Sequence, residues 1–114
     1  MTTPADVAVI PRDVHFRTDS ARGTAWLGGD PVATAVFNAL SLTFPDGERL
    51  FIDSVRAFRG QLSGKLADEV RAFMAQEALH SREHANLNAG LDRSHYPVER
   101  IETSVRRRIA FLRR

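Results

Sequence analysis

The strongest constraint on the fold is one long segment, residues 65–88, in which a side-chain pattern of helical period holds from end to end. The segment contains no proline or glycine, and Gly90 follows it. Alternating steps of four and three residues keep the pattern within an arc of about 100°, the width of a helix face that packs in a core. The stripe consists of Leu66, Val70, Phe73, Glu77, His80, His84 and Leu87. The sequence therefore predicts a long amphipathic helix here.

Proline and glycine divide the neighbouring sequence into further helices. Asp30–Pro31 combines an N-cap acid with proline at the first helical position, which starts a helix. Pro45 must end or kink that helix, a second runs over residues 45–59, and Pro97 opens the last. The apolar residues at helical spacing are Val32, Val36, Ala39 and Leu40, then Phe51, Ile52, Val55, Phe58 and Leu62, then Val98, Ile101, Val105, Ile109 and Leu112.

The first residues carry no helical pattern. Pro4 and Pro11 interrupt any helix, and residues 14–16 have the composition of a short strand. A length of 114 residues suits a single domain. We therefore expect an irregular N-terminal arm over residues 1–29 and an all-α domain of three to four helices over residues 30–114.

Composition excludes several classes of protein. The chain has no cysteine, so a metal can be held only by His, Asp or Glu, and there is no disulfide scaffold. Five of the 16 basic residues are arginines within the last ten positions, so the rest of the chain is net acidic and makes a poor nucleic-acid surface. No apolar run approaches the roughly 20 residues of a membrane span, and the N-terminus lacks the features of a secretory signal. A cytoplasmic location is the expectation.

Three neighbouring positions of the long stripe carry metal-ligand side chains where apolar ones are expected. Glu77, His80 and His84 follow one another on this face. A buried carboxylate costs several kcal/mol unless a cation or a proton accompanies it, and a divalent metal would satisfy the carboxylate and both imidazoles together. Glu48 projects from the core-facing side of the preceding helix. The pattern predicts a site for iron, manganese or zinc held by Glu48, Glu77, His80 and His84.

Other interpretations of the same residues remain open at this stage. A glutamate such as Glu48, taken alone, is more often a solvated helix residue than a ligand, and a single histidine on an apolar face is usually a hydrogen-bonded core residue. Residues 80–84 also match H-x-x-E-H, in which two histidines hold zinc and Glu83 would be the general base. Otherwise Glu83, like Glu69 and His15, is expected to be solvated, and His95 is not expected to be a ligand.

Two blocks of this sequence carry a resemblance to a known family. The first block is Phe44-Pro45-Asp46-Gly47-Glu48, and two shorter matching segments, Asp30-Pro31 and Phe37-Asn38-Ala39-Leu40-Ser41, precede it. The second block is Glu77-Ala78-Leu79-His80, together with His84. Over about residues 7–112 the chain resembles the bacterial family of predicted metal-dependent hydrolases. The resemblance implies a ferritin-like helical fold, a metal-dependent hydrolase activity on an unnamed small-molecule substrate, and ligand positions at Glu48, Glu77, His80 and His84.

The chain departs from this family in length, because members run to more than twice its size. A dimetal bundle takes a Glu and a Glu-x-x-His from each of two helix pairs, and this sequence supplies one such set. Either two chains form a homodimer that completes the bundle, or the chain is a truncated half-bundle. Two further functions stay open: a di-iron carboxylate oxidase or oxygenase, and a non-catalytic helical interaction domain.

Overall fold

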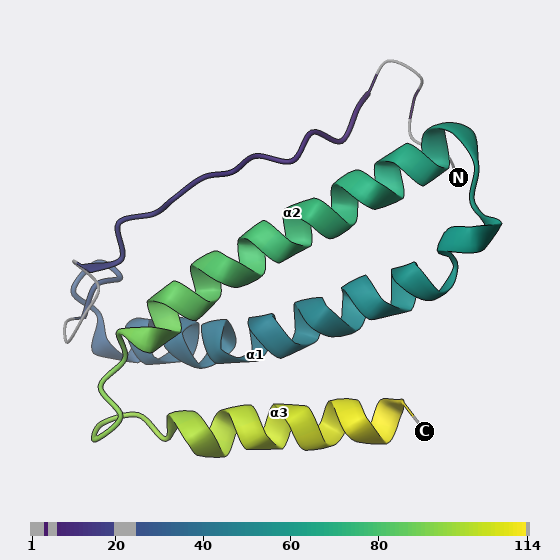
Figure 1. Cartoon of the computed structure of the whole chain (residues 1–114). Helices are drawn as coiled ribbons and strands as arrows, with labels where there is room; N and C mark the ends of the chain where they lie inside the picture. Colours follow the sequence, from purple (N-terminus) through teal and green to yellow (C-terminus); the bar gives the residue numbers. More distant parts are fainter. Residues whose placement is uncertain (1–3, 5–6, 20–24, 114) are drawn as a thin grey trace.

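A computed structural model describes residues 4, 7–19 and 25–113 of the chain. Its elements in order are α1 (Pro31–Ala57), a 3₁₀ turn η2 (Arg59–Gln61), α2 (Gly64–Ala89) and α3 (Val98–Leu112), as Figure 1 shows. The described residues contain no strand. The predicted all-α fold is confirmed.

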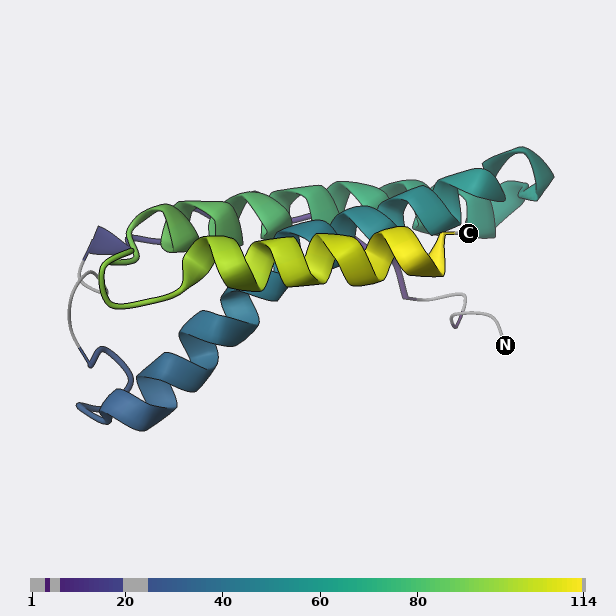
Figure 2. The same ribbon diagram turned by 90° about the horizontal axis from the view of Figure 1, so that it is seen from below.

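Helix α1 is a single bent helix where the sequence predicted a break or a kink. Its first turn is capped by Asp30, whose carboxylate accepts hydrogen bonds from the amides of Val32 and Ala33 at 2.8 and 3.0 Å. Pro45 lies inside the helix, and Figure 2 shows the two halves of α1 meeting at a pronounced angle. Proline has no amide hydrogen for the carbonyl four residues earlier, here that of Ser41. The kink therefore leaves one carbonyl without its helical partner.

Helices α1 and α2 form an antiparallel hairpin (Figure 1). Gly64 begins α2 with φ of +57°, a left-handed conformation that other residues rarely adopt, and Gly90 caps its C-terminus. The predicted boundaries of this helix, residues 65–88, agree with the structure to within one residue at each end.

Helix α3 packs against α1 on the side away from α2. Leu42 of α1, Leu91 of the α2–α3 connection and Val98 of α3 form the small apolar core, with exposed fractions of 2, 9 and 0%. An ion pair of 2.7 Å between Arg113 and Asp53 ties the end of α3 to α1. These contacts make α1 the central helix of the three.

Figure 2 shows α2, α3 and the second half of α1 side by side, whereas the first half of α1 turns away from them at the kink. The molecule measures 48 × 36 × 20 Å. Much of the apolar sequence pattern of α1 is consequently exposed, not buried as its helical spacing suggested. The exposed apolar residues of α1 and its C-cap are Val32, Val36, Phe37, Leu40, Phe44, Phe51 and Phe58.

The N-terminal arm runs along α2 (Figure 1). The expected strand at residues 14–16 is wrong, because this segment hydrogen bonds to side chains of α2 and to no other strand. The amide of Arg12 donates to Gln76 Oε1 at 2.8 Å, and the amide of Phe16 donates to Glu83 Oε2 at 2.9 Å. Within the described residues, no helix has the length and apolar character needed to cross a bilayer.

Candidate metal centre

Three of the four predicted ligands come together where α2 crosses the bend of α1. Glu48, His80 and His84 each offer a ligand atom within 4.8 Å of the other two. His80 turns Nδ1 towards Glu48, 2.7 Å from Oε1, and Nε2 towards His84, 3.0 Å from its Nε2. Two histidines one helical turn apart thus present the same ring nitrogen to a common point.

A hydrogen-bond chain between α1 and α2 fixes the proton positions at His84. Asn88 Nδ2 donates at 3.0 Å to the Ser41 carbonyl, the one that Pro45 leaves without a helical partner. Asn88 Oδ1 therefore faces Ser41 Oγ, which donates its only proton to it at 2.7 Å. Ser41 Oγ must then accept from His84 Nδ1, 2.8 Å away. The Nε2 atom of neutral His84 is left with its lone pair directed at His80.

The environment of His84 favours this neutral form. Burial of its ring lowers the pKa of His84, and the nearby charge of His80 lowers it further. Phe44 forms part of this environment, because its ring centroid lies 4.5 Å from that of His84 and 6.0 Å from that of His80. A neutral imidazole is the form that binds a metal.

Glu48 is the most deeply buried acid of the site, with 2% of its surface exposed. Neither of its carboxylate oxygens accepts a well-aligned hydrogen bond from the described residues. Burial raises the pKa of Glu48; the charge of His80 and the nearby hydroxyl of Ser81 oppose this rise, and the negative charge of Glu77 adds to it. A buried carboxylate with no well-aligned hydrogen bond is unusual in a folded protein, and its environment fits a bound cation.

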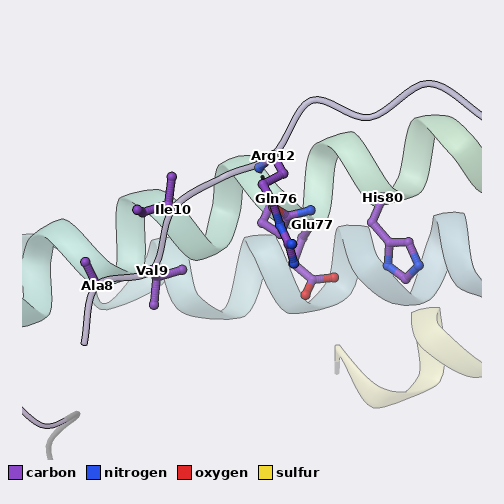
Figure 3. Close-up of a pocket in the computed structure, with 7 residues that line it drawn as sticks. All are labelled: Ala8, Val9, Ile10, Arg12, Gln76, Glu77 and His80. Atoms are coloured by element: carbon purple, nitrogen blue, oxygen red, sulfur yellow. Dashed lines mark hydrogen bonds between the residues drawn. The ribbon is translucent and has the colours of Figure 1, made fainter. Parts of the chain in front are cut away.

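Glu77 lies beside the cluster, outside the set of three. Figure 3 shows its carboxylate and the imidazole of His80 projecting from α2 on the side of α1. Its side chain is half-buried, and its charge acts on Glu48. Glu77 as a ligand stays a prediction.

Glu83 points away from this cluster, towards the arm. It accepts hydrogen bonds from the Phe16 amide at 2.9 Å and from Arg82 Nε at 2.8 Å, and these lower the pKa of Glu83. The expectation that Glu83 is solvated is wrong, because only 9% of the residue is exposed. General bases at neutral pH usually have a raised carboxyl pKa. These contacts do not favour the predicted general-base role of Glu83, which stays untested.

The predictions of solvent exposure for the remaining polar residues are wrong for one residue and agree with the structure for another. Glu69 is not solvated as expected: its side chain is 14% exposed and pairs with Lys65 at 3.1 Å. His15 is solvated as predicted, with 69% of its side chain exposed. His95 is exposed and contacts Tyr96, outside the cluster.

A cavity of 730 Å³ adjoins the cluster between the arm and α2 (Figure 3). His80 and Glu77 line one side of it. Ala8, Val9 and Ile10 of the arm supply its apolar wall. The exposed half of His80 therefore borders a space large enough for a small molecule.

Sequence reasoning missed Ser41, Asn88 and Phe44. Asn88 follows His84 by four residues, so the polar character of the α2 face continues one turn beyond the predicted ligands. Ser41 precedes Pro45 by four residues, which marks the carbonyl that needs an outside donor. Both signals are present in the sequence.

Comparison with known protein families matches residues 10–114 to the family described as "Predicted metal-dependent hydrolase". No curated protein and no solved structure matches the chain. Because the family match covers most of the sequence, the chain belongs to this family.

Proposed function

We propose that this member of the predicted metal-dependent hydrolase family binds a divalent metal through His80, His84 and Glu48 and hydrolyses a small-molecule substrate. The observation that carries the proposal is the 3.0 Å approach of the two Nε2 atoms beside a buried carboxylate that lies 2.7 Å from His80 Nδ1 and accepts no well-aligned hydrogen bond. A ferritin-like arrangement, of which these helices form half, is part of the proposal.

The residues present fit a metal. Zinc–nitrogen bonds of about 2.0–2.1 Å in a tetrahedral site place two nitrogen ligands roughly 3.3 Å apart, close to the separation of the two Nε2 atoms. The free oxygen of Glu48 adds a negative charge. Glu77, one turn before His80 on α2, is our candidate for a further carboxylate ligand.

The other residues of the site act through these ligands. Ser41 holds His84 in the tautomer whose Nε2 is free, and Glu48 holds Nδ1 of His80 so that Nε2 faces the same point. Phe44 covers the two rings on one side and excludes water from them. A bound divalent metal would polarise a scissile bond and lower the pKa of water. The cavity between the arm and α2 gives the substrate its place.

A second function is favoured by the make-up of the cluster. Two histidines and one carboxylate are the ligand set of non-haem iron oxygenases, as well as of some zinc hydrolases. An iron-dependent oxidase or oxygenase is therefore the alternative. A near-ultraviolet charge-transfer band in the metal-loaded protein would favour iron redox chemistry, and hydrolysis supported by bound zinc without such a band would favour the hydrolase.

Metal content tests the proposal directly. Protein purified without chelator should hold close to one equivalent or more of iron, manganese or zinc by elemental analysis. His84→Ala should lose at least about 90% of this metal, since it removes one of three ligands. His95→Ala is the matched control, because His95 lies outside the cluster, and it should keep the metal. Wild-type protein with less than about a tenth of an equivalent would support the non-catalytic interaction domain instead.

A further inference from the structure

Four phenylalanines recur at every seventh position along α1 and its C-cap. We call Phe37, Phe44, Phe51 and Phe58 the phenylalanine row; their exposed fractions are 51, 38, 56 and 58%. Seven residues are close to two helical turns, so this spacing keeps the row to one side within each half of the kinked helix. An exposed apolar row of this kind is typical of an interaction surface on a folded protein.

The molecule also exposes more surface than its mass requires. Its accessible area is 8319 Å², whereas a compact monomer of 12.7 kDa exposes about 6,200 Å². The difference, roughly 2,000 Å², is similar to what one subunit buries in an obligate dimer. A thickness of 20 Å agrees with a layer of helices that lacks a second layer.

The row adjoins the candidate metal centre. Phe44 belongs to the row and stacks near both His80 and His84. The side chain of His80 is 51% exposed, so the centre is open to solvent on one side. A partner seated on the row would extend over this opening.

The middle of the row contains a glycine with open space beside it among the described residues. Gly47 lies inside α1 with a negative φ, and a Cβ built there would meet no atom within 4 Å. Glycine inside a helix costs about 1 kcal/mol relative to alanine. Gly47 lies between Phe44 and Phe51, near the midpoint of the row, where the absence of a side chain lets a second backbone approach.

We propose that the phenylalanine row binds a second copy of this chain, with the two α1 helices antiparallel and crossing at Gly47. A two-fold interface requires a self-complementary surface. The row meets this requirement, because reversing it about its centre places Phe44 opposite Phe51 of the partner subunit and Phe37 opposite Phe58 of the partner subunit. The proposed dimer is independent of the proposed function, except that its covering of a metal centre rests on that function.

Light scattering on the whole chain over about 1–200 µM tests the dimer. We expect twice the chain mass at the upper concentrations. Phe51→Asp places a charge in the row away from the metal cluster and should weaken association at least about 30-fold. Phe111→Asp is the matched control: Phe111 is 72% exposed on α3, off the row, and its substitution should leave association unchanged.

A second variant keeps the test informative if Phe51→Asp misfolds. Gly47→Leu fills space that is open in the single chain and improves helix propensity, so the monomer should unfold at a higher temperature while association weakens at least about tenfold. A wild-type monomer at 200 µM overturns the proposal. A dimer whose association is unchanged in both row variants contradicts the assignment of the interface to the phenylalanine row.

Metal analysis of the same samples separates the two proposals. A monomer that holds metal contradicts the dimer and leaves the proposed function standing. A dimer without metal supports the interface and contradicts the hydrolase.

Discussion

Helix α1 carries two rows of side chains with the same seven-residue repeat and opposite surroundings. The inner row, Thr34, Ser41 and Glu48, is polar and only 1, 2 and 2% exposed. The phenylalanine row on the neighbouring side is apolar and at least 38% exposed. Within this chain the usual distribution of polar and apolar residues on a helix is inverted.

The inversion limits how much the inner row can stabilise the fold. Hydrogen bonds satisfy two of the three residues of the inner row: Thr34 accepts from the Leu27 amide at 3.1 Å, and Ser41 bonds to Asn88. Such bonds contribute about 1 kcal/mol each, less than burial of a large apolar side chain. The inner face of α1 contributes Ser41 and Glu48 to the candidate site, and its exposed apolar face is the surface of the dimer that we propose.

Removing an apolar side chain from the buried face should have the largest effect on stability. Leu42→Ala should lower the free energy of unfolding by about 2–5 kcal/mol, because Leu42 packs in the core with Val98. Urea denaturation measures this difference.

The matched control is Leu40→Ala, two residues earlier on the exposed side. Leu40 is 46% exposed, so at concentrations where the chain is monomeric the loss should stay below about 1 kcal/mol. Equal losses in the two variants would contradict the assignment of inner and outer faces.

Removing the polar link between α1 and α2 should have an intermediate effect. Asn88→Ala leaves the buried Ser41 carbonyl without a donor and should cost about 1–3 kcal/mol. In a Pro45→Ala background residue 45 regains an amide hydrogen for that carbonyl, so the same substitution should cost about 1 kcal/mol less. A double-mutant cycle by urea denaturation measures the coupling, and additive losses would mean that the kink and Asn88 are independent.

The smallest expected effects are pH dependences of opposite sign for two buried carboxylates, measured by thermal unfolding with chelator present. The pKa of Glu48 is raised, so its stabilising effect is present at acidic pH and is lost as the pH rises through that pKa. The pKa of Glu83 is lowered, so its effect is present above the ordinary carboxyl range and is lost as the pH falls. The difference in unfolding temperature between the wild type and Glu48→Gln should fall as the pH rises, and the difference between the wild type and Glu83→Gln should fall as the pH is lowered. The same pH dependence in both variants would contradict this electrostatic description.

Local signals in the sequence predicted the helix boundaries well. Gly90 and Pro97 end α2 and precede α3 as expected, since glycine and proline act on backbone geometry whatever the surroundings. Pro45 was compatible with a break or a kink. The helix continues because Asn88, 43 residues later, supplies the donor that the proline removes.

Three of the four predicted ligands come together in the structure, and the hydrogen bonds that position them were not predictable. Helical spacing on α2 placed His80 and His84 on one face, and the bend and hairpin of α1 brought Glu48 to them. The roles of Ser41 and of Phe44 depend on the axial position of α2 relative to α1, and the periodicity within either helix does not define this position.

The sequence by itself determined where α1 and α3 begin, where α2 begins and ends, and which residues share each helical face, because these depend on interactions within one or two turns. The tertiary structure alone decided which face of α1 is inside. Burial is a property of what packs against a residue: α2 packs against the inner row, where Ser41 bonds to Asn88, whereas every residue of the phenylalanine row is at least 38% exposed among the described residues. Hydrophobicity gives a side chain a preference for burial, but only a neighbouring surface can bury it.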